Sequence, residues 1–226
     1  PPIFAQAAGA PLAYVAATQP RPQSEAVLVP KDSPLKSAAD LKGKKVALNK
    51  GSNVHYFLVK LLEKNGLNYS DVNVVFLPPA DARAAFEKKS VDAWVIWDPF
   101  SAAAEQALEA RRLVDATGVV NNRAYYFSSL DYAQKNQDVI KVLIDELNQV
   151  DVWGAANKAA LGAELAQLWG LSRSVGEATT SRTVFGVGPI TKAILAEQQA
   201  IADSFYALKL IPKKINVLEA AAAGLA

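Results

Sequence analysis

The segment from Leu48 to His55 brings a glycine, a hydroxyl group and an amide together at a turn between an apolar run and an amphipathic helix. Gly51, Ser52 and Asn53 stand at this turn, where the backbone N–H groups of the helix begin. A helix start carries about half a positive charge and several unpaired donors, so it can hold an anion without a formal cation. The alternative is that Ser52 or Asn53 only caps the helix. No P-loop lysine and no dinucleotide-binding glycine pattern is present, which disfavours a nucleotide.

A second candidate contact lies at the end of another apolar run. Trp97 and Asp98 close the run 93–97 and enter the turn before the next helix. In open α/β sheets, ligands collect at the carboxyl ends of strands, so this turn and the one after Leu48 are expected at one edge. The alternatives are core packing for Trp97 and helix capping for Asp98.

Three other residues are candidates with plainer alternatives. His55, the only histidine, lies one turn into the helix and has no companions for a metal site; a packed or solvated ring is its alternative. Arg182 is expected in a loop between helices, where it could face an anion or simply be a surface arginine. Phe185 follows in the same loop. The sequence predicts no metal site, no cofactor and no catalytic residue.

Alternating strands and helices must position these residues. Apolar runs without polar alternation are typical of strands covered on both faces, so an α/β fold with a doubly wound parallel sheet is expected. The expected strands are 12–17, 26–29, 45–48, 74–77, 93–97, 112–114 and 124–127, and the expected helices are 1–9, 52–65, 80–88, 102–111, 139–152, 159–169 and 190–208.

Composition excludes several classes of protein. With 226 residues, 51% hydrophobic and 20% charged, the chain is long and apolar enough to fold around a core. The net charge of +2 is spread without a block of like charges, which gives no support to nucleic-acid binding. The absence of cysteine excludes disulfides, thiolate metal sites and a cysteine nucleophile within these residues. Prolines interrupt the uncharged run 1–20, which argues against a membrane-spanning helix. The start at Pro1 without Met indicates a piece of a larger product.

Seven segments, in order along the whole chain, resemble the aliphatic sulfonate-binding proteins of ABC importers, within the wider group of nitrate, taurine and thiamine-precursor binding proteins. They are PPIFAQAAGA (1–10), ADLKGKKVA (39–47), KGS (50–52), PADARAAF (79–86), VDAW (91–94), IWDP (96–99) and LIPKK (210–214).

This resemblance implies a two-lobed periplasmic-binding-protein type II fold. Lobe I is expected at 1–24 and 129–226, without an N-terminal family segment, and lobe II at 25–128, with crossing strands near 26–29 and 124–127. Carried over by position, Gly51, Ser52 and Asn53 supply donors to the ligand, and Trp97 with Asp98 lines the interlobe cleft. Asn53 departs from the small hydroxyl residue that is common at its position.

The resemblance also implies a function. It indicates a monomeric, non-enzymatic receptor that captures a small organic sulfonate and delivers it to an ABC permease, in the periplasm or lipid-anchored outside the cytoplasmic membrane. One alternative is a receptor for nitrate, taurine or another small anion. Another is a thiamine-pyrimidine synthase-like enzyme, in which His55 or a lysine would participate, and a third is a regulatory effector-binding domain.

Overall fold

The structure is a computed structural model that describes residues 1–221. By its internal contacts the chain divides into two units, each built from separate chain segments. Unit 1 comprises Pro1–Pro20, Arg123–Ala156 and Val184–Ala226, and unit 2 comprises Arg21–Asn122 and Asn157–Thr183. Residues 222–226, the last five of the predicted lobe I, lie outside the described residues.

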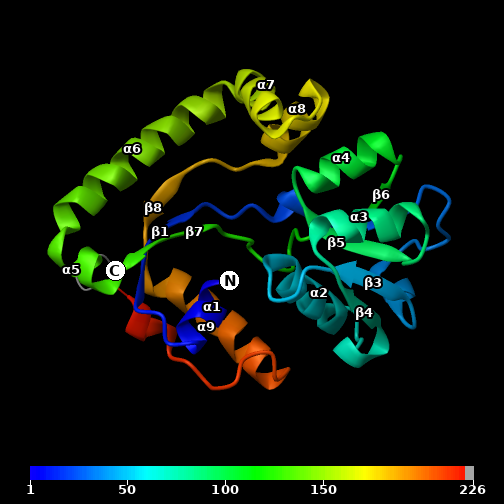
Figure 1. Ribbon diagram of the computed structural model, residues 1–226, viewed down its shortest axis with the longest axis horizontal. Coiled ribbons are helices and arrows are strands. Elements are labelled where there is room, and N and C mark those ends of the chain that lie inside the picture. The colour runs from blue at the N-terminus through cyan, green and yellow to red at the C-terminus, as the bar shows by residue number, and fades with distance from the viewer. Residues whose placement is uncertain (222–226) are drawn as a thin grey trace. The chain divides into compact units, whose positions relative to one another are not determined.

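Unit 2 contains a five-stranded mixed sheet in the order β4-β3-β5-β2-β6 (Figure 1). Strand β3 is parallel to β4 and β5, whereas β2 is antiparallel to β5 and β6. The expectation of a parallel sheet is therefore wrong for β2, which begins at the edge where β5 ends. The strands are β2 (Glu25–Val29), β3 (Lys45–Leu48), β4 (Asn73–Phe76), β5 (Ala93–Trp97) and β6 (Arg111–Asp115).

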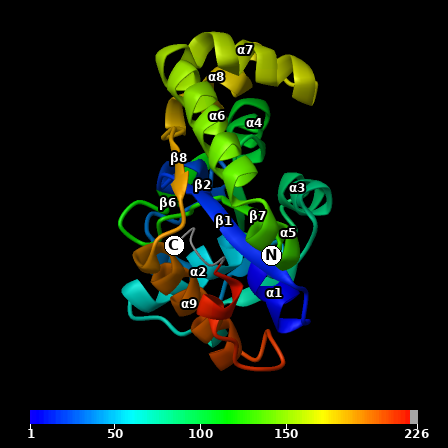
Figure 2. The same ribbon diagram turned by 90° about the vertical axis from the view of Figure 1, so that its left-hand side faces the viewer.

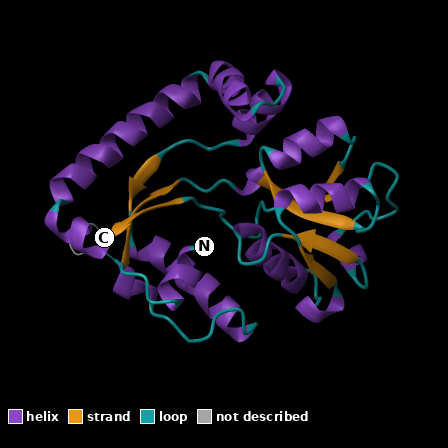
Figure 3. Ribbon diagram, viewed as in Figure 1, coloured by secondary structure: helices purple, strands orange, loops and turns teal. Residues whose placement is uncertain are grey.

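Helices cover both faces of this sheet (Figure 3), and this explains why its strands show no polar alternation. Leu48 and Val95 face an apolar core that includes α2, while Trp94 and Ile96 face a second core that includes α3 and α4. The helices are α2 (Asn53–Lys64), α3 (Pro79–Glu87) and α4 (Phe100–Ala107). Unit 2 also contains the 3-10 turns η1 (Pro22–Ser24), η2 (Ala38–Leu41) and η3 (Tyr69–Asp71).

Two further helices, α7 (Lys158–Trp169) and α8 (Arg173–Arg182), complete unit 2. They approach so closely that a Cβ atom on Gly176 would clash with the carbonyl oxygen of Gly162. Val175 of α8 also packs on α4. The observed units thus differ from the predicted lobes, which assigned 129–226 to lobe I, because α7 and α8 pack with elements of unit 2.

Unit 1 is built around a three-stranded antiparallel sheet in the order β7-β1-β8 (Figure 2). Val15, Ile140, Ile144 and Val187 form its core, so that α6 packs along the sheet. The strands are β1 (Leu12–Thr18), β7 (Tyr125–Ser129) and β8 (Val187–Pro189); the helices are α1 (Pro2–Ala7), α5 (Leu130–Lys135), α6 (Gln137–Ala156), α9 (Lys192–Ala207) and the 3-10 turn η4 (Val217–Ala220).

The expected crossing strands near 26–29 and 124–127 differ from the observed arrangement. Strand β2 lies wholly in the sheet of unit 2 and β7 wholly in that of unit 1, and the unit boundaries fall at 20/21 and 122/123. The short elements α5 and β8 lack a strong apolar period and were not expected. Within residues 1–221, no helix is long and apolar enough to cross a membrane.

Candidate functional site

Most of the predicted site residues gather at one edge of the sheet of unit 2. Strands β3 and β5 are parallel neighbours, so the turns after Leu48 and Trp97 leave the sheet on the same side. Strand β2 runs the opposite way and begins there, with Glu25 opposite Trp97. This edge therefore combines the start of α2, the end of β5 and the first residue of β2.

His55 holds the loop that precedes α2. Gly51 has a left-handed φ of 72° and donates its N–H to Nδ1 of His55 at 3.1 Å, while Nε2 of the ring lies 2.8 Å from the Tyr69 hydroxyl group. Because Nδ1 accepts a hydrogen bond, the ring proton sits on Nε2. Burial, together with the charge of Lys50, lowers the pKa of His55 to about 4, so the ring is neutral at pH 7. The structure thus gives His55 the packed position that was the alternative to ligand contact.

Neither Ser52 nor Asn53 caps α2 with its side chain. Ser52 occupies the N-cap position, but its Oγ donates to the carbonyl oxygen of Asn49 at 2.7 Å. Asn53 instead donates from Nδ2 to Oε1 of Glu25 at 2.7 Å and to Oδ1 of Asn122 at 3.2 Å. The N–H groups of Asn53 and Val54 begin the helix and have no intrahelical acceptor, so they remain suited to an anion.

Glu25 and Asn122 belong to this cluster although sequence reasoning missed them. Glu25 is fully buried, and burial raises the pKa of its carboxyl group to about 8 against the opposing effect of the Asn53 hydrogen bond. Its Oε2 atom has no hydrogen-bond partner among residues 1–221. Asn122 donates to the carbonyl oxygen of Arg21 at 3.1 Å and so fixes its own amide toward Asn53. The one available signal was an acidic residue at the start of an apolar strand.

Asp98 and Arg182 contact each other. Nη1 of Arg182 lies 3.1 Å from Oδ1 of Asp98, whose side chain is 1% exposed, and the same Oδ1 accepts the N–H of Ala102 at 3.0 Å. Nη2 of Arg182 donates to Oε2 of Glu105 at 2.7 Å, and Arg112 joins the network through Glu105 at 3.3 Å. Arg182 is the last residue of α8, so its expected position in a loop is wrong. A ligand contact of either residue stays a prediction.

Trp97 and Phe185 have different surroundings. Trp97 is half-buried at the end of β5, borders both apolar cores of unit 2, and meets the Phe100 ring edge-on with 6.0 Å between the ring centroids. Phe185 belongs to unit 1, in the connection between α8 and β8. The structure therefore assigns Phe185 to a different unit from the other predicted site residues.

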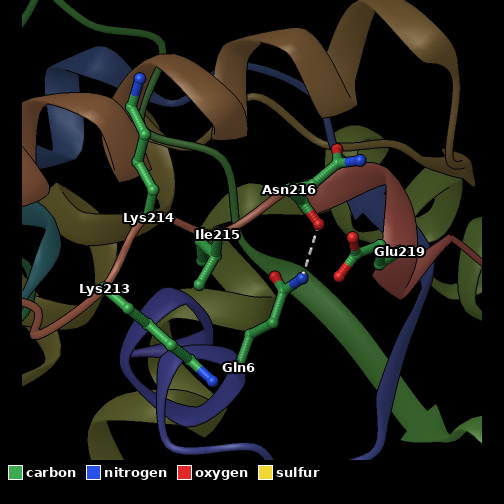
Figure 4. Close-up of a pocket in the computed structure, with 6 residues that line it drawn as sticks. All are labelled: Gln6, Lys213, Lys214, Ile215, Asn216 and Glu219. Atoms are coloured by element: carbon green, nitrogen blue, oxygen red, sulfur yellow. Dashed lines mark hydrogen bonds between the residues drawn. The ribbon is translucent and has the colours of Figure 1, made fainter.

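A hollow of about 410 Å³ lies elsewhere, on unit 1 (Figure 4). Gln6 crosses it and donates from Nε2 to the carbonyl oxygen of Asn216 at 2.8 Å. None of the predicted site residues lines this hollow; its lining residues are Gln6, Lys213, Lys214, Ile215, Asn216 and Glu219. Residues 1–221 contain no group of three or more histidine or acidic side chains that could hold a metal ion.

Comparison with known proteins gives consistent matches along the chain. The family model described as NMT1/THI5 like matches residues 2–149. The chain is 40% identical to an aliphatic sulfonates-binding protein of Escherichia coli K12 over 218 residues, which are 96% of this chain and 68% of that protein. A protein of the same description from Bacillus subtilis is 29% identical over 96% of this chain and 66% of its own length. The chain thus spans about two thirds of these relatives.

Solved structures show the same fold. The periplasmic aliphatic sulphonate binding protein of Escherichia coli matches with a TM-score of 0.93 at 39% identity, over 98% of this chain and 72% of its own. The alkanesulfonate-binding protein of Xanthomonas axonopodis pv. citri, bound to MOPS, matches with a TM-score of 0.90 at 40% identity, over 98% of this chain and 77% of its own. A desulfurization enzyme, at 17% identity and a TM-score of 0.68, shares the fold alone.

Proposed function

Because the chain belongs to the NMT1/THI5-like family, we propose that it is the substrate-binding protein of an ABC importer and that it captures an aliphatic sulfonate. The protein binds its ligand without changing it, needs no cofactor and delivers it to a membrane permease. It acts as a monomer outside the cytoplasmic membrane, in the periplasm or held there by a lipid anchor.

One observation carries this proposal: 40% identity, extending over 96% of the chain, to a relative described as an aliphatic sulfonates-binding protein. A likeness of this extent is far more specific than any single motif. The alternative of a thiamine-pyrimidine synthase-like enzyme has no comparable support, since the enzyme among the matched structures is only 17% identical.

The chemistry at the edge of the unit 2 sheet suits a sulfonate head. A sulfonate is a monoanion with three acceptor oxygens and carries no proton near neutral pH. The backbone N–H groups of Asn53 and Val54 offer neutral donors at the positive end of α2, which favours binding that is still reversible. Trp97 offers an apolar face for the aliphatic tail.

Gly51 and Ser52, which were expected to donate hydrogen bonds to the ligand, then have a different role. The N–H of Gly51 and the hydroxyl group of Ser52 already have partners in His55 and Asn49. We infer that these two residues shape the loop, while the first N–H groups of α2 contact the anion.

The test is a calorimetric titration of the intact, desalted protein with hexanesulfonate, taurine, nitrate and sulfate, in a buffer without sulfonate groups. We expect hexanesulfonate to bind with a Kd in the low micromolar range, about −8 kcal/mol. Tight binding of taurine or nitrate instead of hexanesulfonate would support the receptor proposal but assign it a different substrate. The absence of binding to all four would refute the receptor proposal.

A matched pair of glycine variants tests the place of the site. Gly51 and Gly66 both have φ values of 72° and stand on either side of α2. Alanine at either position adopts a left-handed conformation at a cost of about 1 kcal/mol. We expect Gly51→Ala to lower sulfonate affinity tenfold or more and Gly66→Ala to leave it unchanged. Equal affinity of the two variants would remove this loop from the site.

A further inference from the structure

The side chains of the two polar residues at the start of α2, Ser52 and Asn53, already use their hydrogen-bond donors within the protein. Both hydrogen atoms of the Asn53 amide are directed to Glu25 and Asn122, and the Ser52 hydroxyl group donates to Asn49. Oε2 of Glu25 is a buried polar atom beside them that has no hydrogen-bond partner among residues 1–221. This oxygen can donate a hydrogen bond only when the carboxyl group carries a proton.

The carboxyl group of Glu25 accepts a hydrogen bond from Asn53, the first residue of α2. The 2.7 Å contact between Asn53 Nδ2 and Glu25 Oε1 ties the carboxyl group to the helix start that offers N–H groups to an anion. An ionised Glu25 would repel an anion there across a short distance in a poorly solvated place. A protonated Glu25 would remove this repulsion and add a donor.

The charged groups around Glu25 are already paired with other residues. Arg112 on β6 donates to the backbone carbonyl oxygen of Glu25 at 3.4 Å, while its charge is balanced by Glu105 on α4. Asp115 on β6 accepts the N–H of Thr117, and Asp98 after β5 pairs with Arg182 of α8.

On the α2 side, His55 is neutral at pH 7, and Lys50 lies over the Phe76 ring. No basic side chain within residues 1–221 forms an ion pair with the Glu25 carboxyl group, so no such pair opposes the burial that raises its pKa to about 8.

We propose, resting on the sulfonate-binding function above, that Glu25 is a specificity-determining residue of the anion site: it binds one proton together with the anion and donates a hydrogen bond from Oε2 to it. A sulfonate brings no proton of its own, so the protein supplies one. The site therefore accepts a fully ionised monoanion while Glu25 is protonated and rejects it when Glu25 is ionised.

The direct test is proton uptake on binding. The intact protein is titrated calorimetrically with hexanesulfonate at pH 8 in Tris and in triethanolamine, because the difference between buffers of unequal ionisation enthalpy reports the protons bound. Because the pKa of Glu25 is about 8, we expect uptake of about half a proton per ligand at pH 8. For the same reason, we expect the affinity for hexanesulfonate to be about thirtyfold lower at pH 9.5 than at pH 6.5.

Two variants identify the group that titrates. Glu25→Gln keeps an acceptor for Asn53 and a donor at the position of Oε2, so we expect binding without proton uptake and with a flat dependence on pH. Asp115→Asn, which removes a carboxyl group from neighbouring β6 and keeps the contact to Thr117, is expected to behave as the wild type. Circular dichroism verifies the fold of both variants.

The outcomes are distinct. Wild-type binding without proton uptake, or a Glu25→Gln variant with the wild-type pH dependence, would overturn the role of Glu25 and leave the receptor intact. A wild-type protein that binds no sulfonate at any pH would overturn both proposals. The number of protons that the wild-type protein takes up on binding tests the proposal even if Glu25→Gln fails to fold.

Discussion

At the scale of single residues, the imidazole ring of His55 determines the shape of the loop before α2. Its two nitrogens bind Gly51 on one side and Tyr69 on the other, at 3.1 and 2.8 Å. A ring with these partners has one tautomer and one orientation. His55 is therefore a positioning residue, which acts on a ligand through the Gly51 backbone.

Two substitutions separate the acceptor of His55 from its bulk. His55→Asn retains an acceptor at the position of Nδ1, whereas His55→Leu leaves the buried N–H of Gly51 without a partner, which costs about 1 to 3 kcal/mol. We expect hexanesulfonate affinity to fall about tenfold or more in the leucine variant and less than threefold in the asparagine variant, measured by calorimetry. Equal losses would show that the acceptor is unimportant.

The lowered pKa of the His55 ring makes the free energy of unfolding depend on pH. The folded protein holds the pKa of His55 at about 4, below the ordinary value of 6.5, so the unfolded chain binds more protons between these values. The stabilisation is thus fully present above pH 6.5 and is lost as the pH falls toward 4. Urea unfolding at pH 7 and pH 4.5 should show a loss of stability about 2 kcal/mol larger in the wild type than in His55→Asn.

At the scale of elements, one ion network attaches α8 to the remainder of unit 2. Arg182 binds Asp98 and Glu105, and its own side chain is only 20% exposed. Removal of the guanidinium group would leave two carboxyl groups in a poorly solvated place. A half-buried network of this kind is sensitive to the loss of one partner.

Arg173, on the same helix, provides the matched control. It pairs with Glu177 at 2.7 Å, but its side chain is 71% exposed. We expect Arg182→Leu to lower the free energy of unfolding by about 2 to 3 kcal/mol and Arg173→Leu by less than about 0.5 kcal/mol. Urea unfolding measures both, and equal losses in the two variants would contradict an anchoring role for Arg182.

The accuracy of sequence-based expectations also differs from element to element. Strands β3 and β5 were predicted with their exact bounds and α2 to within a residue at each end, because strong apolar patterns and Gly66 mark them. Helix α8 was missed because it presents little more than Val175 to a core and depends on close packing with α7 at Gly176.

For the candidate site, too, sequence patterns predict some residues and miss others. Ser52 and Trp97 were placed at the correct edge of the sheet, since connection rules determine where strands end. Glu25 and Asn122 were not, because they meet Asn53 only through contacts 28 and 69 residues apart. The partnership of Asp98 with Arg182 likewise requires the packing of α8, which no local pattern predicts.

At the scale of the whole molecule, ligand binding should appear as thermal stabilisation. A ligand at one hundred times its Kd stabilises the folded state by about 2.7 kcal/mol. For a chain of this size, the unfolding midpoint should rise by roughly 5 to 10 °C. We expect scanning calorimetry to show this rise with hexanesulfonate in Gly66→Ala and a much smaller one in Gly51→Ala. The same rise in both variants would place the ligand elsewhere.

The separation of Arg182 from its partners also determines when unit 2 can be completed during synthesis. Arg182 follows Asp98 by 84 residues and Glu105 by 77. A ribosome adding roughly 5 to 20 residues per second exposes the sheet of unit 2 for several seconds before this cation emerges. Through that interval the nascent chain holds Asp98 and Glu105 without Arg182, although Arg112 is already present to pair with Glu105. The ion network of unit 2 is completed only when the last turn of α8 has been synthesised.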